Sequence, residues 1–265
     1  MENPQFDFAV LGAGPGGYVA AIRGAQLGLK TAVIEKDRPG GVCLNWGCIP
    51  SKALIHQANL LRGIPALKAL GAAVDTTNLD YSRAHRKSRQ ASDRLAKGVQ
   101  YLLQKNGVEV IAGEGRLADA STIALADGRT ITARAIIIAT GSRPRELPGL
   151  PFDETVVLSS TGALSLKELP RRILILGAGA IGLELGYVWN AFGAEVTIVE
   201  ACARILPLES ADAAALVRRI FEKRGVKFIT GALAHAGARD AEGLTLDLKP
   251  AAAGDGNGSD IPARV

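Results

Sequence analysis

Two cysteines separated by four residues are the first candidates for chemistry in this chain. Cys43 and Cys48 enclose Leu-Asn-Trp-Gly, and Pro50 follows shortly after. Proline suits the first turn of a helix because it gives up no needed hydrogen-bond donor there. A thiol at a helix N-terminus has its thiolate stabilised by the positive helix end, and two such thiols can cycle between dithiol and disulfide. The spacing therefore indicates a redox-active pair.

Other interpretations of the pair remain open. A zinc site would need further ligands, and only Cys202 and three scattered histidines, His56, His85 and His235, are present. Two inert buried cysteines are possible, whereas a structural disulfide is disfavoured in a cytosolic protein. An odd number of cysteines forms no disulfide framework, so a cytoplasmic protein is expected. We expect Cys202 to be a core residue and the histidines to be ordinary surface or core residues.

A glycine pattern that occurs twice indicates nucleotide binding. The glycines of the two G-x-G-x-x-G copies are Gly12, Gly14 and Gly17, and Gly177, Gly179 and Gly182. The first glycine permits a tight turn, the second lets the backbone approach a pyrophosphate, and the third lets the helix pack on the strand. Glu35 and Glu200 end the second strand of each copy, where a carboxylate can accept hydrogen bonds from ribose hydroxyls. At Glu200 it should disfavour a 2′-phosphate, which predicts NAD rather than NADP.

The elements that position these residues repeat as strand, glycine turn, helix and strand. The expected ranges are Phe8–Leu11, Gly16–Leu27 and Thr31–Ile34, and Ile173–Leu176, Ala180–Phe192 and Val196–Val199. Between the copies we expect a helix from Ser51 to about Leu70, interrupted near Gly63–Pro65, a long helix over 80–106, and a small antiparallel meander over 116–133. A helix near 210–224, a strand over 244–248 and a loop over 251–260 follow. The fold class is α/β, with two Rossmann-like βαβ domains.

Composition excludes several classes of protein. Hydrophobic residues make up 48 % and charged residues 22 % of the chain, so it can build a packed core. The longest uncharged apolar stretch, Phe8–Ile22, is too short to span a membrane and contains a proline. An acidic N-terminus argues against a secretory signal. The formal charge is +5, and the densest basic run, Arg83–Lys97, is expected to be a solvated helix face.

The segment from Gly40 to Lys52, G-G-V-C-L-N-W-G-C-I-P-S-K, resembles the redox motif of the FAD-dependent pyridine nucleotide-disulfide oxidoreductases. Ser159–Leu164 and Ile181–Gly186 are similar to further segments of that family. The L-N-x-G-C-I-P-S-K form looks most like the members that oxidise dihydrolipoamide. The resemblance covers essentially the whole chain and implies electron flow from dihydrolipoamide to a Cys43–Cys48 disulfide, then to FAD and to NAD⁺.

The resemblance also implies a role for each matching residue. FAD contacts would be made by Gly12, Gly14, Gly17, Glu35, Lys52, Gly115, Thr140, Gly141 and Ser142. NAD contacts would be made by Gly177, Gly179, Gly182, Glu184 and Glu200. Cys48 would lie against the flavin as the charge-transfer thiolate, and Cys43 would exchange with the substrate. Lys52 and Glu184 would form an ion pair beside the flavin ring, although either could instead be a solvated helix residue.

The resemblance divides the chain into an FAD-binding domain over 1–147 and an NAD-binding domain over 148–265. Family members are longer, so we expect an incomplete NAD domain and no C-terminal dimerisation domain with its histidine–glutamate pair. The implied partners are dihydrolipoamide on a lipoyl domain of a 2-oxoacid dehydrogenase complex and, for a full-length member, a second subunit. A positioned base contributes about 10² to 10⁴ in rate, so a fast dithiol reaction is not expected without that domain. Alternatives are a non-catalytic FAD- and NAD-binding fragment, or a related glutathione- or mercuric-type reductase.

Overall fold

A computed structural model describes residues 4–240, 243–251 and 261–264. The chain forms two compact units, the first made of residues 1–50 and 87–143 and the second of residues 51–86 and 144–265. Two long helices, α3 (Cys48–Ala69) and α4 (Tyr81–Lys105), contribute residues to both units. Each unit is described by itself. None of the helices in the described residues is both long enough and apolar enough to cross a bilayer.

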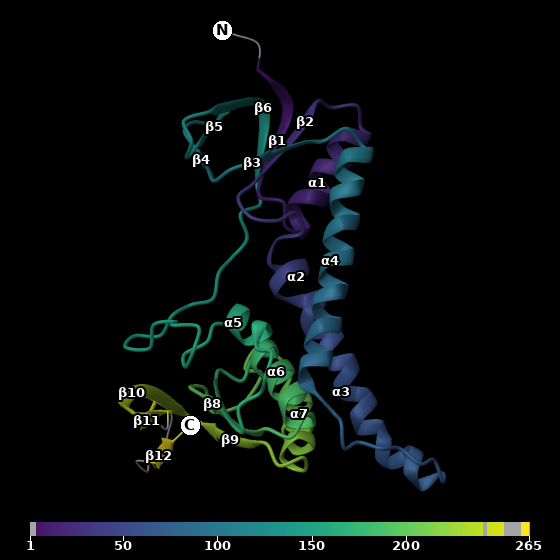
Figure 1. Cartoon of the computed structure of the whole chain (residues 1–265). Coiled ribbons are helices and arrows are strands. Elements are labelled where there is room, and N and C mark those ends of the chain that lie inside the picture. The colour runs from purple at the N-terminus through teal and green to yellow at the C-terminus, as the bar shows by residue number, and fades with distance from the viewer. Residues whose placement is uncertain (1–3, 241–242, 252–260, 265) are drawn as a thin grey trace. The chain divides into compact units, whose positions relative to one another are not determined.

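The first unit is built on a six-stranded sheet with strand order β3-β2-β1-β6-β5-β4 (Figure 1). Its strands are β1 (Phe6–Leu11), β2 (Thr31–Glu35), β3 (Glu109–Ala112), β4 (Gly115–Leu117), β5 (Thr122–Leu125) and β6 (Thr130–Ile138). Strands β3, β2, β1 and β6 are parallel, and β6, β5 and β4 form an antiparallel meander. Helices α1 (Pro15–Gln26) and α2 (Gly41–Trp46) follow β1 and β2. This confirms the first βαβ motif and the meander.

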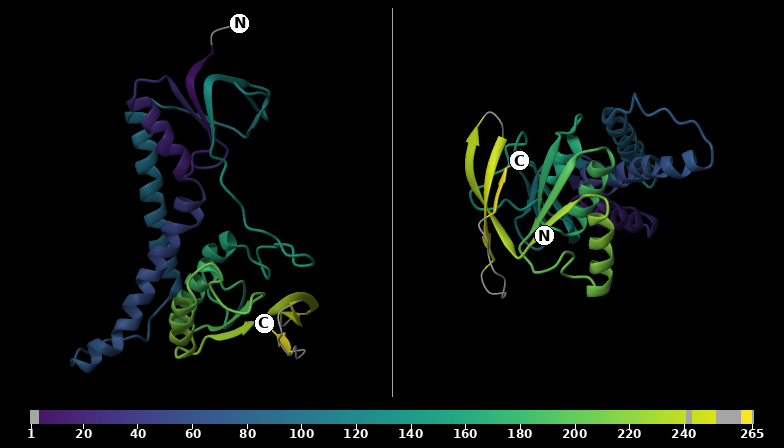
Figure 2. Two further views of the ribbon diagram at one scale, coloured as in Figure 1. Left: turned by 180° about the vertical axis from the view of Figure 1, so that it is seen from behind. Right: turned by 90° about the horizontal axis from the view of Figure 1, so that it is seen from below.

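The second unit contains two three-stranded sheets. One is parallel, with the order β7 (Arg172–Leu176), β8 (Glu195–Glu200) and β9 (Lys227–Thr230). The other is antiparallel and consists of β10 (Ala232–Asp240), β11 (Gly243–Pro250) and β12 (Ile261–Arg264). Figure 2 shows the yellow strands β10–β12 as a sheet separate from β8 and β9. The helices here are α5 (Ser160–Ser165), α6 (Ala180–Ala191) and α7 (Ala211–Glu222).

The internal repeat is preserved as a strand, a glycine turn, a helix and a second strand in each copy. Gly14 and Gly179 precede α1 and α6 with nearly the same extended backbone, φ −70° and ψ −175° against φ −78° and ψ −175°. Strand β1 lies between β2 and β6, whereas β7 pairs, among the described residues, only with β8. This difference explains why Val10 is fully buried but Ile175 at the matching position is only half-buried.

Three details differ from the sequence-based expectations. The predicted interruption near Gly63–Pro65 is wrong, because α3 continues to Ala69 with Pro65 inside it. The short helix α2 was not predicted, since its start depends on Gly40 in a left-handed conformation, φ 102°. Strand β10 was also missed, because its alanine-rich sequence has little strand propensity and it is paired along β11. Most of the expected loop over 251–260 lies outside the described residues.

Candidate functional site

The first glycine loop joins β1 to α1 in a form that only glycine permits. Gly12 has φ +102°, and a Cβ there would lie 2.3 Å from the carbonyl oxygen of Ala139. A Cβ on Gly17 would lie 1.8 Å from the carbonyl oxygen of Gly12. At Gly14 the nearest atom would be 3.9 Å away, so the loop surface is open there. The loop thus leaves a backbone surface at the start of α1 that suits a phosphate.

The second loop repeats this geometry between β7 and α6. Gly177 has φ +103°, and a Cβ on Gly182 would lie 2.1 Å from the carbonyl oxygen of Gly177. Apart from the glycine itself and its two chain neighbours, no heavy atom of the described chain lies within 4 Å of a Cβ added at Gly177 or Gly179. Glycine is therefore required at position 177 by the positive φ and at position 182 by the close approach of the Gly177 carbonyl, whereas the space around Gly179 is open.

A glutamate at the end of the neighbouring strand accepts hydrogen bonds from the backbone of each glycine loop. Glu35 accepts hydrogen bonds from the backbone N–H of Ala13 (2.8 Å) and of Asp37 (2.9 Å). Glu200 does the same with Ala178 (2.7 Å) and Cys202 (2.9 Å). A carboxylate has about four lone-pair sites, so each can fix its loop and still accept a ribose hydroxyl.

The two cysteines lie on either side of the junction between α2 and α3, both within the first unit. Cys43 is half-buried in the cluster that contains Val10 and Val33, and Cys48 is exposed as the first residue of α3. This confirms that Cys48 stands at a helix N-terminus. Cys202 is exposed, so its prediction as a core residue was wrong; it follows β8 and lies outside the sheet.

The start of α2 packs directly on the first glycine loop. The N–H of Gly40 donates to the carbonyl of Ala13 (2.8 Å). A Cβ on Gly41, which has φ +58°, would lie 2.6 Å from the Cα of Gly14. The glycine pair before Cys43 thus lets the cysteine-bearing helix begin against the first glycine loop.

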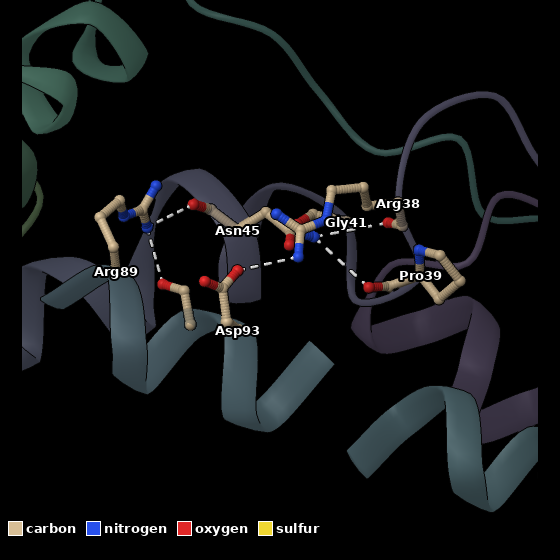
Figure 3. Close-up of polar contacts among 7 residues, drawn as sticks. Arg38, Pro39, Gly41, Asn45, Arg89 and Asp93 are labelled. Atoms are coloured by element: carbon tan, nitrogen blue, oxygen red, sulfur yellow. Dashed lines mark hydrogen bonds and ion pairs between the residues drawn. The ribbon is translucent and has the colours of Figure 1, made fainter. Parts of the chain in front are cut away.

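A polar network holds the residues between the cysteines (Figure 3). Asn45 is buried, and its Nδ2 donates to the carbonyls of Arg38, Pro39 and Gly41, the last at 2.9 Å. The guanidinium of Arg89 on α4 donates to the Asn45 carbonyl (2.6 Å) and lies 5.0 Å from the centroid of the Trp46 ring.

Arg89 therefore departs from the solvated face expected for Arg83–Lys97. Burial lowers its pKa from the ordinary value. Its partner Asn45 lies far from it in sequence, so only the tertiary structure identifies the pair as part of the site.

The remaining predicted site residues are divided between the two units. Lys52 and Glu184 form an ion pair within the second unit, with side chains 60 % and 30 % exposed. In the first unit, a Cβ on Gly115 would lie 2.8 Å from a methyl of Ile123, and Gly141 has φ +72° between the exposed Thr140 and Ser142.

The histidines suggest no site of their own. His56 and His235 are exposed, and His85 is buried. Within the described ranges, no three His, Cys, Asp or Glu side chains gather as metal ligands.

Comparison with known proteins gives a consistent result. The family model for pyridine nucleotide-disulphide oxidoreductases matches residues 6–264. Dihydrolipoyl dehydrogenase of Chlorobaculum tepidum is 42 % identical over 248 residues, covering 92 % of this chain and 53 % of that protein. The mitochondrial dihydrolipoyl dehydrogenase of Schizosaccharomyces pombe is 44 % identical over 235 residues, covering 86 % and 46 %.

The fold matches as well. The crystal structure of LpdA from Mycobacterium tuberculosis superposes with a TM-score of 0.81 at 29 % identity, covering 91 % of this chain and 55 % of that one. The chain spans about half the length of the curated relatives it matches.

Proposed function

Because the chain belongs to the pyridine nucleotide-disulphide oxidoreductase family, we propose that it carries the nucleotide-binding and dithiol chemistry of a dihydrolipoyl dehydrogenase. One observation carries the proposal: the helix bearing Cys43 begins on the first glycine loop, through the Gly40–Ala13 hydrogen bond and the Gly41–Gly14 contact. The redox pair and a nucleotide-binding loop are thereby parts of one substructure.

The two loops fit two nucleotides. Residues 1–147 would bind FAD, with Gly12, Gly14 and Gly17 at its pyrophosphate and Glu35 at its ribose. Residues 148–265 would bind NAD through Gly177, Gly179, Gly182 and Glu200. The open space at Gly14 and Gly179 supports this assignment, because a pyrophosphate must approach the backbone there.

Further FAD contacts are proposed outside the first glycine loop. Gly115, Thr140, Gly141 and Ser142 would complete the FAD site. Gly141 has a positive φ, and Thr140 and Ser142 are exposed at the end of β6. Their backbone and hydroxyl groups can therefore reach a ligand.

The cysteines perform thiol–disulfide exchange. A thiolate of dihydrolipoamide attacks Sγ of Cys43 in the oxidised pair, the Cys43–Cys48 bond breaks, and Cys48 leaves as a thiolate. The second substrate thiol then attacks the mixed disulfide, which releases cyclic lipoamide and returns Cys43 as a thiol. The α3 N-terminus stabilises the Cys48 thiolate. Overall, dihydrolipoamide and NAD⁺ give lipoamide, NADH and a proton.

Bound FAD would supply the two-electron centre between the cysteine pair and NAD⁺. Lys52 lies one helical turn after Cys48, and its ammonium would be oriented beside the flavin ring by Glu184. The Asn45–Arg89 network keeps the segment between the cysteines in place while their bond opens and closes.

The partners and location are also proposals. The substrate dithiol would be carried on a lipoyl domain of a 2-oxoacid dehydrogenase complex, in the cytoplasm. A second subunit would provide the base that deprotonates the dithiol, as the family resemblance implies.

The visible spectrum of the purified chain with FAD, before and after one equivalent of dithiol, tests the proposal. We expect a bound flavin band that gains a long-wavelength shoulder on reduction. Cys48→Ser should abolish the shoulder, whereas the matched variant Cys202→Ser should retain it. A shoulder of equal strength in Cys48→Ser, or no flavin binding, would refute the assignment.

A further inference from the structure

A pocket of about 360 Å³ in the second unit is lined by two arginines and three apolar side chains. Arg62 comes from α3, and Arg224 lies just after α7. Leu61, Pro65 and Ala191 form the apolar wall. None of these residues belongs to the glycine loops or the cysteine segment, so the pocket has no part in the proposed function.

Both guanidinium groups are held in place by the same tyrosine. The Cζ of Arg62 lies 4.8 Å and that of Arg224 5.2 Å from the centroid of the Tyr187 ring. Arg62 also donates to Oδ1 of Asn190 (2.7 Å), and Nδ2 of Asn190 donates to the Arg224 carbonyl (3.2 Å). The Arg62 guanidinium is thus fixed by a hydrogen bond, and that of Arg224 lies against the same ring. Positioning the cations before a ligand arrives lowers the entropy lost on binding.

Among the described residues, no carboxylate forms an ion pair with either arginine of the pocket. Arginines elsewhere in the chain form ion pairs, as in Arg38–Asp93 and Arg218–Glu222. Within the part of the chain that the structure describes, neither Arg62 nor Arg224 forms one, and Nε of Arg62 is buried without a hydrogen-bond partner. Burial and the nearby charge of Arg224 lower the pKa of Arg62. Two like charges in one pocket repel each other, and an anion would relieve that repulsion.

We propose that Arg62 and Arg224 form a binding site for a small phosphate-bearing anion. Guanidinium groups present a planar fork of donors that matches phosphate oxygens, and two of them match the charge of a dianion. The apolar wall can accept the carbon atoms next to the phosphate of an ester. The site is separate from the glycine loops and goes beyond the nucleotide and dithiol chemistry proposed above.

Isothermal titration calorimetry with inorganic phosphate at constant ionic strength tests the site. Saturating FAD and NAD⁺ are present in one series, so that phosphate cannot occupy the glycine loops, and absent in the other. We expect saturable binding in both series, weakened at least tenfold in Arg62→Gln and in Arg224→Gln. Arg219→Gln is the matched control, because it removes one exposed charge from α7 and should leave the affinity unchanged.

Several results would overturn the proposal. The first is that phosphate shows no saturable binding, and the second is that Arg224→Gln binds phosphate with wild-type affinity. The third is that Arg219→Gln loses as much phosphate affinity as the pocket variants. The fourth is that acetate binds as tightly as phosphate. Arg224 is exposed, so its variant decides the matter even if Arg62→Gln unfolds. Glycerol phosphate distinguishes the two sources: tighter binding than inorganic phosphate indicates an ester as the ligand, and equal binding indicates free phosphate. The outcome does not depend on flavin binding or turnover.

Discussion

Replacement of Gly179 by alanine should separate nucleotide binding from folding. Gly179 has φ −78° and ψ −175°, which alanine adopts without strain. Apart from Gly179 and its chain neighbours, no heavy atom of the described chain would lie within 4 Å of an added Cβ. Surface changes of this kind usually alter the free energy of unfolding by less than about 0.5 kcal/mol. The methyl would, however, occupy the space through which a pyrophosphate approaches the backbone of the loop.

The expected loss in binding is much larger than the change in stability. Hydrogen bonds to charged groups contribute about 1.5–3 kcal/mol each. A tenfold change in dissociation constant corresponds to about 1.4 kcal/mol. Displacing one phosphate contact should therefore weaken NAD⁺ binding by roughly 10- to 150-fold. Calorimetric titration with NAD⁺ measures the affinity, and urea unfolding of the same preparation measures the stability.

Gly182→Ala is the contrasting variant. Its Cβ would lie 2.1 Å from the carbonyl oxygen of Gly177, so backbone must move, and overpacking of this kind costs about 1–3 kcal/mol. We expect this variant to lose both stability and NAD⁺ binding. Wild-type NAD⁺ affinity in Gly179→Ala would show that the pyrophosphate does not lie on this loop, and the reasoning from open space would fail.

Three further predictions concern side chains of the second unit. Glu200→Gln should lower the free energy of unfolding by about 1 kcal/mol, because the charged acceptor for two backbone N–H groups is lost. The same variant should also have a smaller preference for NAD⁺ over NADP⁺, measured as the ratio of the two dissociation constants. A hydrogen bond to the Glu200 carboxylate raises the pKa of the Cys202 thiol. The Cys202 thiolate therefore forms at higher pH than that of a free cysteine. In a Cys43→Ser/Cys48→Ser background, the pH dependence of Cys202 alkylation by iodoacetamide should move to lower pH when Glu200→Gln is added. An unchanged curve would contradict this cause. Lys52→Met should change stability by less than about 1 kcal/mol, because the Lys52 side chain is 60 % exposed, yet it should slow flavin reduction by dithiol. A stability loss above about 2 kcal/mol in urea unfolding would contradict the exposed position of Lys52.

The glycine loops were predictable because their requirements are local. A positive φ at Gly12 and Gly177 follows from the turn between a buried strand and a helix, and only glycine adopts it readily. The acid at the end of the next strand is placed by the parallel pairing of two adjacent strands. These restraints act within one βαβ motif, so the same residues recur at the same spacing in both copies.

The sequence by itself therefore determined the α/β class, the geometry of the two glycine loops and the position of Cys48 at a helix start. The family resemblance also implied the Lys52–Glu184 ion pair. Only the tertiary structure showed that Arg89 meets the backbone carbonyl of Asn45 and that Arg62 meets the Tyr187 ring. Each of these pairs joins two helices whose relative placement depends on the packing of a whole core. No local pattern encodes that placement, because a basic residue on a solvated helix face and one bound to a distant carbonyl look alike in sequence.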